Sequence, residues 1–305
     1  MKIWITGSSG MVGQNLLECK QAQSYQIFAP TSREVDLLSP VSIQNFLAQH
    51  RPDFVIHAAG HVGGIQSNML HKSLYLEKNL LMGFNLIHAL KDAKVTRLLN
   101  LGSSCMYPRN CEGAIPESKM LTGELEPTNE GYAIAKIAVA KLAEYISKEQ
   151  TEFRFKTLIP CNLYGRFDKF DAARSHLVPS ILVKIRDAIK QNQKEVEIWG
   201  DGEARREFMY AGDFANYVFD LVARFDDVPP YLNVGLGYDY SINEYYQTAA
   251  KVMGFSGRFF HNLDKPVGMK RKLVDITQLN AIGVKHDSGL ESGLTNTLQF
   301  LKVLE

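Results

Sequence analysis

Tyr132 and Lys136 are the two side chains whose types and spacing best suit acid–base chemistry. A separation of four residues places both on one face of a helix, where both can point at one substrate. A free tyrosine has a pKa of about 10 and is a slow proton donor near neutrality, and a neighbouring ammonium lowers that pKa. Ser103 follows the apolar run Arg97–Leu101 and is placed to hydrogen-bond a carbonyl oxygen. Together these residues predict proton transfer at a reacting carbonyl group.

A glycine-rich turn lies between an apolar run, Lys2–Ile5, and a helical pattern that begins at Met11. Gly7 permits the tight turn, Gly10 lets the backbone approach a pyrophosphate, and Gly13 lets the helix pack close to the strand. The free N–H groups and the positive dipole end of that helix suit phosphates. A turn without a ligand is the alternative, but a strand before it and a helix after it favour dinucleotide binding.

The end of the second expected strand bears on the choice between the two nicotinamide cofactors. NAD-binding units usually place an acidic residue there for the ribose 2′-hydroxyl, whereas this chain has Ser32 and Arg33. A serine and an arginine suit a 2′-phosphate, which favours NADP(H), and a solvated surface arginine is the alternative. The small residues Ala58–Gly60 leave room for a cofactor, although they could equally serve helix–strand packing.

Short apolar runs alternate with helical patterns through the first half of the chain, and these elements must position the residues named above. Strands are expected at Lys2–Ile5, Tyr25–Ala29, Phe54–Ala58, Arg97–Leu101 and about Arg154–Leu158, and helices at Met11–Cys19, Pro40–Gln49, Ser73–Leu90 and Tyr132–Lys148. Strands this short and apolar are buried on both faces, which predicts a parallel sheet covered by helices. The expected fold class is α/β, a Rossmann-type doubly wound parallel sheet with a smaller C-terminal α/β substrate domain.

After Gly165 the alternation weakens. Polar loops surround a helix at about Val178–Lys190 and short extended pieces at Val196–Trp199 and Tyr231–Val234. We therefore expect residues 1–165 to bind the cofactor and residues 166–305 mainly to bind the substrate, with parts of 205–240 returning to the first domain. Ligands of doubly wound folds bind beyond the carboxyl ends of the strands, so the second domain would close over them.

The composition is that of a globular protein, with 305 residues, 45% hydrophobic and 22% charged. Because 34 Lys+Arg stand against 33 Asp+Glu, no basic excess is available for nucleic acid. The four cysteines lack C-x-x-C spacing, so we expect reduced thiols and no metal site. No signal-peptide pattern opens the chain and no apolar run spans a bilayer, which predicts a cytoplasmic protein without membrane contact.

The glycine turn, Ser103 and the Tyr132/Lys136 pair together match the short-chain dehydrogenases/reductases. Further segments make the match more specific. They are Ala59–Ile65, Gly102–Pro108, Leu125–Glu130, Tyr132–Ala138, Asn162–Gly165, Ser175-His176, Trp199-Gly200 and Arg206–Phe208. Over nearly its whole length the chain resembles the GDP-L-fucose synthases, which are extended members of that group. Cys105, in the loop of Ser103, is a discriminating mark of this resemblance.

The resemblance implies an NADPH-dependent enzyme that epimerises C3 and C5 of a GDP-4-keto-6-deoxy sugar through an enolate and then reduces the C4 ketone. It implies Cys105 as the thiolate base and His176 as the acid on the opposite face, with Ser103 and Tyr132 stabilising the enolate oxygen. Judged alone, Cys105 would be a buried hydrophobe and His176 an ordinary hydrogen-bonded residue. The resemblance also implies that Lys184 and Arg206 neutralise the sugar-nucleotide pyrophosphate.

Three sets of site residues follow. The expected catalytic residues are Ser103, Cys105, Tyr132, Lys136 and His176. The expected NADP(H) contacts are Gly7, Ser9, Gly10, Met11, Val12, Gly13, Ser32, Arg33, Asp36, Leu37, Ala58, Ala59, Gly60, Tyr132, Lys136, Pro160, Asn162, Leu163 and His176. The expected substrate contacts are Ser104, Cys105, Asn162, Lys184, Trp199 and Arg206.

Two departures from the family pattern concern the ligands. The turn has Ser8-Ser9 where the family usually has an arginine for the NADP phosphate, and Lys265-Pro266-Val267-Gly268 lacks the aspartate of the family's Lys-Pro-Asp-Gly. Loss of a carboxylate near the sugar favours a different sugar. A GDP-4-keto-6-deoxy-heptose, reduced at C4 with little or no epimerisation, is therefore the alternative substrate.

Other functions on the same fold are a 4,6-dehydratase, a redox-neutral 4-epimerase and a non-catalytic dinucleotide-binding sensor. A dehydratase would want an acid pair where Ser104-Cys105 stands, an epimerase needs no Cys/His pair, and a sensor has no need of the serine, tyrosine and lysine together. The helices Ser73–Leu90 and Tyr132–Lys148 could pair across a two-fold axis, so a homodimer is expected, although their core-facing stripes would look the same in a monomer.

Overall fold

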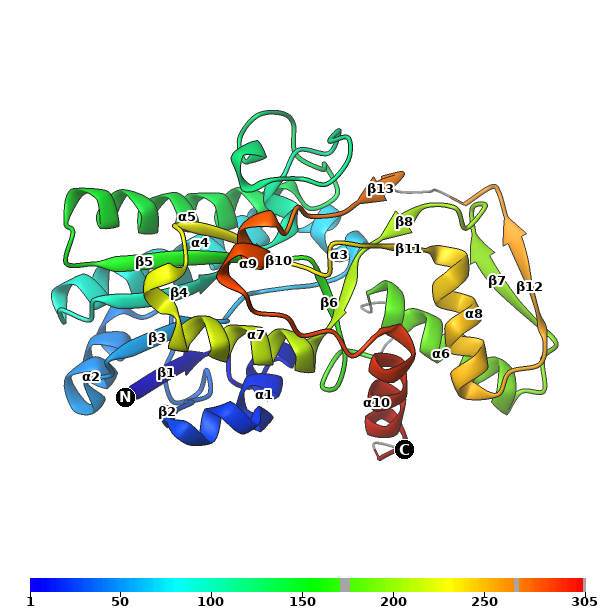
Figure 1. Cartoon of the computed structure of the whole chain (residues 1–305), viewed down its shortest axis with the longest axis horizontal. Coiled ribbons are helices and arrows are strands. Elements are labelled where there is room, and N and C mark those ends of the chain that lie inside the picture. Colours follow the sequence, from blue (N-terminus) through cyan, green and yellow to red (C-terminus); the bar gives the residue numbers. More distant parts are fainter. Residues whose placement is uncertain (171–175, 266–268, 304–305) are drawn as a thin grey trace.

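A six-stranded parallel sheet forms the larger part of the molecule (Figure 1). The computed structural model describes residues 1–170, 176–265 and 269–303. The strands are β1 (Lys2–Thr6), β2 (Gln26–Phe28), β3 (Phe54–His57), β4 (Arg97–Leu101), β5 (Arg154–Pro160) and β10 (Tyr231–Val234), in the order β10-β5-β4-β3-β1-β2. The chain passes from β2 back across β1 to β3, so the topological switch point lies between β1 and β3. The expected doubly wound fold is confirmed.

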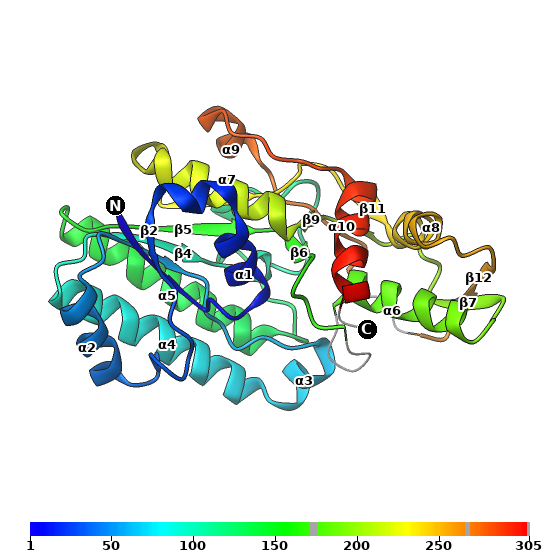
Figure 2. The same cartoon turned by 90° about the horizontal axis from the view of Figure 1, so that it is seen from below.

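Helices cover both faces of this sheet (Figure 2). On one face lie α2 (Pro40–His50), α4 (Lys72–Asp92) and α5 (Glu130–Glu149), and on the other lie α1 (Met11–Glu18) and α7 (Ala211–Ala223). Strand residues alternate between the two layers, because Trp4 packs with the α2–α4–α5 core while Ile3 and Ile5 pack with the α1–α7 core. The strands are therefore apolar on both sides, as their sequences predict.

A smaller group of elements lies beyond the carboxyl ends of the strands (Figure 1). Its helices α6 (Leu177–Lys190), α8 (Ile242–Met253) and α10 (Leu290–Val303) share a separate core. Its strands form the pair β7 (Glu195–Trp199) and β12 (Arg258–Asn262) and the sheet β11 (Tyr240–Ser241)-β8 (Arg205–Arg206)-β13 (Arg271–Lys272). Two short helices, α3 (Ile65–Leu70) and α9 (Thr277–Ile282), lie in connections.

The chain crosses between the two parts more than once. After β5, β6 (Asn162–Tyr164) pairs in parallel with β9 (Phe208–Tyr210), and α7 and β10 then return to the main sheet. Tyr231–Val234, one of the short extended pieces noted after Gly165, pairs with β5 as the edge strand of the main sheet. It falls within the range 205–240 for which a return was allowed.

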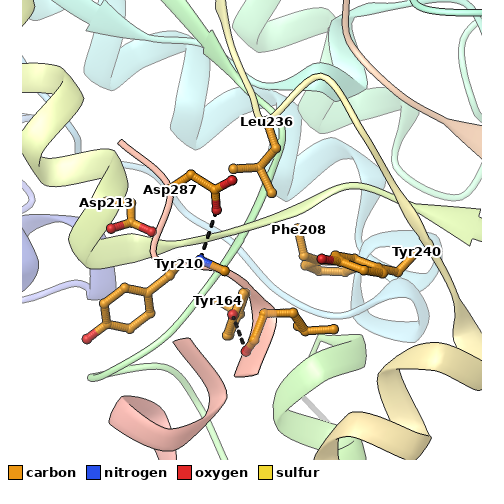
Figure 3. A pocket seen from close by; sticks show the side chains of 9 residues that line it. Tyr164, Phe208, Tyr210, Asp213, Leu236, Tyr240 and Asp287 are labelled. Carbon is orange, nitrogen blue, oxygen red and sulfur yellow. Dashed lines mark hydrogen bonds between the residues drawn. The ribbon is translucent and has the colours of Figure 1, made fainter. Parts of the chain in front are cut away.

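Helix α10 is anchored at the junction of the two parts around a small cavity (Figure 3). The Asp213 carboxylate accepts a hydrogen bond from the backbone N–H of Ser288 at 2.8 Å, and the Tyr164 hydroxyl donates to the carbonyl oxygen of Leu290 at 3.5 Å. The cavity has a volume of about 10 Å³, room for roughly one water molecule. None of the predicted site residues lines it, so it belongs to the packing of α10 and not to the candidate site.

Candidate active site

The glycine turn forms at the carboxyl end of β1, beside the switch point of the sheet. Gly7 has a φ of +69°, in the left-handed region, and a Cβ there would lie 2.6 Å from the backbone of Ala59. A Cβ on Gly13 would lie 2.3 Å from the carbonyl oxygen of Gly7. A side chain at either position would force apart the turn, α1 and the end of β3, so both glycines are required by close backbone approach.

The first turn of α1 leaves its N–H groups available to an anion. Its N-cap, Gly10, has no side chain to cap the helix. Ser8 is buried, and its hydroxyl donates to the carbonyl oxygen of Pro30 at 3.0 Å, which ties the turn to the end of β2, while Ser9 is exposed. The cradle fits a dinucleotide pyrophosphate. The predicted contacts Gly7, Ser9, Gly10, Met11, Val12 and Gly13 all lie in it.

The loop after β2 holds the predicted NADP(H) contacts Ser32, Arg33, Asp36 and Leu37. Arg33 is exposed and makes no ion pair within the residues that the structure describes. Glu34, the first acid of the loop, accepts hydrogen bonds from the backbone and the hydroxyl of Thr31, which lower the pKa of its carboxyl. Leu37 is buried in the α2–α4–α5 core, which leaves its side chain little surface for an adenine. Ser32 and Asp36 are exposed in the same loop.

The small residues after β3 lie beside Lys136, one of the predicted catalytic residues. Ala58 and Ala59 are half-buried and Gly60 is exposed. A Cβ on Gly60 would lie 3.8 Å from Nζ of Lys136. The structure thus brings the expected cofactor loop and α5 together.

Helix α5 carries Tyr132 and Lys136 to the end of β4. Lys136 is 6% exposed, and its Nζ donates to the carbonyl oxygen of Leu101, the last residue of β4, at 2.9 Å. The same Nζ lies 5.8 Å from the centroid of the Tyr132 ring. Burial lowers the pKa of Lys136 to about 8. Burial and then the nearby Lys136 charge lower the pKa of His57, at the end of β3, to about 3.

The expectation that Lys136 lowers the pKa of Tyr132 is wrong in this structure. Burial raises the pKa of Tyr132 well above its usual value, Cys105 raises it further, and a hydrogen bond with Ser103 partly opposes the rise. The physical reason is that the Lys136 ammonium is directed at a backbone carbonyl while the phenol is enclosed by protein. Tyr132 therefore keeps its proton at neutral pH, which is the form that can donate one.

Cys105 lies in a short turn after β4 with Ser103 and Ser104. The Ser103 hydroxyl oxygen accepts a hydrogen bond from the backbone N–H of Cys105 at 3.3 Å, and Ser104 is buried. Cys105 is half-buried, and its Sγ accepts a hydrogen bond from Nδ2 of Asn129 at 3.0 Å. Nζ of Lys272 lies 3.9 Å from the same sulfur. Cys105, Ser103 and Tyr132 thus form one cluster.

His176 begins α6 at the edge of the second part. Its side chain is accessible to solvent, yet enough protein surrounds it that desolvation, followed by the charge of Lys169, lowers its pKa. Nζ of Lys169 also donates to the carbonyl oxygen of Val62, in the loop after β3, at 3.3 Å. Within the described residues no hydrogen bond joins His176 to the other four predicted catalytic side chains.

The predicted substrate residues form two basic clusters. Nζ of Lys184 lies 5.4 Å from the ring of Trp199, which is 48% exposed, and donates to the hydroxyl of Tyr246 at 3.4 Å. Burial lowers the pKa of Lys184, so it is not a fully solvated surface lysine. The second cluster pairs Arg206 on β8 with Lys272 on β13 in the strand register. Both are cations without a carboxylate partner in an ion pair among the described residues.

Glu207 holds the second cluster against the main sheet. Its buried carboxylate accepts hydrogen bonds from the backbone N–H groups of Leu236, Gly237 and Val274, at 2.6, 3.0 and 2.9 Å. Its carbonyl oxygen accepts one from Nδ2 of Asn162 at 3.1 Å. This bond ties Asn162 to the residue that follows Arg206. The neighbouring predicted contacts Pro160 and Leu163 end β5 and lie in β6.

Known proteins of similar sequence and structure place this site in a family. Residues 3–235 match the model of the NAD dependent epimerase/dehydratase family. A GDP-L-colitose synthase of Yersinia pseudotuberculosis is 52% identical over 98% of this chain and 97% of its own, and a GDP-L-fucose synthase of Azorhizobium caulinodans is 45% identical over 98% and 96%.

The chain belongs to the GDP-L-fucose synthase group of the NAD dependent epimerase/dehydratase family. The resemblance drawn from its motifs is confirmed. Among solved structures, MlghC, a GDP-mannoheptose C4 reductase from Campylobacter jejuni with NADP bound, superposes with a TM-score of 0.88 at 28% identity, covering 99% of this chain and 98% of its own.

Two side chains in the site of this epimerase/dehydratase are missing from the residues that the sequence predicts. Asn129 lies three residues before Tyr132, and this short separation in sequence is the signal that could have placed it in the site. Lys272 is 167 residues from Cys105 in sequence, so no local pattern connects them.

Part of the expected site lies outside the described residues, namely Ser175 and the Pro266-Val267-Gly268 departure. In the described ranges no group of His, Cys, Asp and Glu is arranged to hold a metal ion. None of the described helices has the length and apolarity to span a bilayer.

Proposed function

We propose that this epimerase/dehydratase reduces the C4 ketone of a GDP-4-keto-6-deoxy sugar with NADPH and epimerises the carbons beside that ketone. The observation that carries the proposal is the closeness of Cys105 to Ser103 and Tyr132. The backbone N–H of Cys105 donates to the Ser103 hydroxyl at 3.3 Å, and both residues act on the Tyr132 phenol. A simple ketone reductase needs the serine, tyrosine and lysine. A thiol at the same carbonyl adds the base that enolisation requires.

The relatives support a GDP-sugar substrate and NADP(H). Their names are GDP-L-colitose synthase and GDP-L-fucose synthase, and the solved C4 reductase acts on a GDP-mannoheptose and holds NADP. The α1 cradle and the exposed Arg33 suit NADP(H), and the clusters around Lys184 and Arg206 suit the pyrophosphate of the sugar nucleotide.

The chemistry divides among the named side chains. The Cys105 thiolate removes a proton from a carbon next to the ketone, and the electron pair moves into an enolate whose oxygen accepts hydrogen bonds from Ser103 and Tyr132. His176 returns a proton from the opposite face, which inverts the carbon. NADPH, when bound, supplies the hydride that reduces C4. Tyr132 then gives its proton to the C4 oxygen, and Lys136 stabilises the phenolate that results.

We further propose the arrangement of the whole enzyme. Residues 1–165 form the NADP-binding domain and residues 166–305 mainly the substrate domain, with 205–240 shared. The enzyme works in the cytoplasm as a homodimer, without nucleic acid or membrane contact. The outer sides of α4 and α5 support the dimer, because both carry exposed apolar side chains there.

The deciding experiment follows NADPH absorbance with GDP-4-keto-6-deoxy-D-mannose in deuterated water, and reads the product sugar by mass spectrometry and NMR. NADPH oxidation with deuterium at C3 and C5 is expected. Oxidation without deuterium at either carbon would leave a reductase and remove Cys105 and His176 from the chemistry. No oxidation would refute this substrate.

A second product is favoured by the 52% identity with a GDP-L-colitose synthase. Colitose has no hydroxyl at C3, so an enzyme that makes it has only C5 to epimerise. The same assay with the 3-deoxy substrate decides between them by kcat/KM. If the enzyme reduces neither hexose substrate but does reduce a GDP-4-keto-6-deoxy-heptose, the heptose is the substrate and both hexose proposals are refuted.

A further inference from the structure

The thiol of Cys105 lies between two nitrogen donors that ketone reduction does not require. Nδ2 of Asn129 donates to Sγ at 3.0 Å, and Nζ of Lys272 lies 3.9 Å from the same atom. The donors come from separate elements, since Asn129 directly precedes α5 and Lys272 is on β13. Two donors directed at one sulfur suit a thiolate, which accepts hydrogen bonds and cannot give any.

Asn129 makes this contact instead of capping its helix. An asparagine at an N-cap usually accepts a hydrogen bond from the first helical turn, but the side chain of Asn129 does not cap α5. Its Oδ1 is buried and has no hydrogen-bond partner among the residues that the structure describes. An uncapped helix and an unpaired buried oxygen both cost stability. Local stability is therefore given up at this residue, as is common at functional sites.

Lys272 brings a charge that no nearby carboxylate neutralises. Its neighbour Arg271 forms an ion pair with Asp239, whereas Lys272 forms none within the described part of the chain. Of the groups that face the sulfur from the elements around it, Ser103 and Tyr132 are uncharged at neutral pH and Lys272 is cationic. An ammonium at this distance favours the charged form of a thiol over the neutral form.

We propose that Asn129 and Lys272 hold Cys105 as a thiolate and thereby make it the base of the epimerisation. The proposal rests on the epimerase part of the proposed function. In the step itself, the sulfur takes a proton from the carbon beside the ketone, the electron pair passes into the enolate, and Cys105 becomes a neutral thiol. Asn129 and Lys272 act through the sulfur and are positioning residues.

The test is the rate at which iodoacetamide alkylates Cys105, measured from pH 5.5 to 9.5 without sugar nucleotide. A Cys111→Ser background removes the other half-buried thiol, since Cys19 and Cys161 are buried. Lys272→Met should slow alkylation at pH 7 about tenfold and move the rate profile to higher pH. Lys272→Arg keeps the positive charge, so Cys105 should be alkylated at about the wild-type rate in that variant.

Two further variants keep the test independent of folding. Lys270→Met removes an exposed lysine two residues earlier and should leave the alkylation profile unchanged. Asn129→Asp has the shape of asparagine but places a carboxylate at the sulfur, so it should slow alkylation as well. Thermal unfolding of each variant is recorded beside its rate.

Alkylation of Lys272→Met at the wild-type rate across the pH range would overturn the inference, whatever the turnover. The proposed function fails by a different result, namely a wild-type enzyme that oxidises NADPH and leaves no deuterium in the sugar. If the inference holds, Lys272→Met also lowers deuterium uptake at saturating substrate more than it lowers the reduction of a ketone already in the product configuration.

Discussion

Desolvation shifts the pKa values of Tyr132, Lys136 and His176 in the direction that favours the neutral form of each, although His176 remains accessible to solvent. Tyr132 keeps its proton at neutral pH. Lys136, with a pKa of about 8, is still mostly charged at pH 7. A protonated phenol near an ammonium is suited to protonate an oxygen on which negative charge develops.

Tyr132→Phe removes this proton donor and keeps the ring. We expect kcat for NADPH oxidation to fall about 10²- to 10⁴-fold, which is the usual contribution of general acid catalysis. Fluorescence titration should show NADPH affinity close to wild type. Tyr145→Phe, on the exposed side of α5, is the control, and a kcat within a few-fold of wild type for Tyr132→Phe would exclude Tyr132 as the acid.

The role proposed for His176 predicts an epimerisation that depends on pH. Desolvation and the charge of Lys169 lower its pKa below the usual value of about 6.5. The imidazole is therefore neutral at pH 7 and gains its proton only as the pH falls through that lowered pKa. Deuterium uptake at C5 per NADPH oxidised should therefore rise as the pH is lowered from 7.5, as long as Cys105 stays deprotonated.

Lys169→Met should move this profile to higher pH, since loss of a nearby positive charge favours the imidazolium. NMR of the product formed at each pH in deuterated water gives the profile, with circular dichroism to confirm that the protein stays folded. A profile that does not move in the variant would remove Lys169 as a cause.

At the level of elements, α4 and α5 approach closely at a glycine. A Cβ on Gly83 would lie 2.4 Å from Cγ2 of Val139. This contact holds α5, which carries Tyr132 and Lys136, against α4 on the same face of the sheet.

Gly83→Ala tests that packing. Alanine gains about 1 kcal/mol over glycine in a helix interior, but overpacking costs about 1–3 kcal/mol, so we expect a net loss of unfolding free energy. Val139→Ala should remove the clash, and the double variant should be more stable than the sum of the single changes predicts. Urea unfolding measures all four proteins, and a Gly83→Ala protein more stable than wild type would contradict the close contact.

Local sequence patterns predict most of the helices and strands that position the site. Arg97–Leu101 forms a strand with the expected bounds, and α5 extends the expected Tyr132–Lys148 by two residues at its start and one at its end. Ser103, Tyr132 and Lys136 meet because strand ends and helical spacing follow local rules. The partner of β10 and the contact of Lys272 with Cys105 are set by residues far away in the chain, which no local period records.

At the level of the whole molecule, α4 and α5 carry exposed apolar side chains on their outer sides. Leu74 and Leu81 are two helical turns apart on α4, and Ile134 and Tyr145 are three turns apart on α5, so each pair lies on one face. An apolar face of this kind suits a second copy of the chain.

We expect the enzyme to sediment as a dimer at micromolar concentration and the Leu81→Lys/Ile134→Lys protein to sediment as a monomer. Desolvating two lysines in such an interface is unfavourable. Leu263→Lys changes an exposed leucine on a different part of the surface and should leave the dimer intact. A monomeric wild-type enzyme would refute the proposed interface.

The late position of β10 has a consequence for synthesis of the chain. Strand β5 leaves the ribosome well before its neighbour Tyr231–Val234, and at ordinary translation rates this interval lasts on the order of ten seconds. During that time β5 has an open hydrogen-bonding edge, which is a template for pairing with other nascent chains. We therefore expect a fragment ending at residue 165 to aggregate although it contains the whole glycine turn, and a soluble, monomeric fragment would show that the edge is protected in another way.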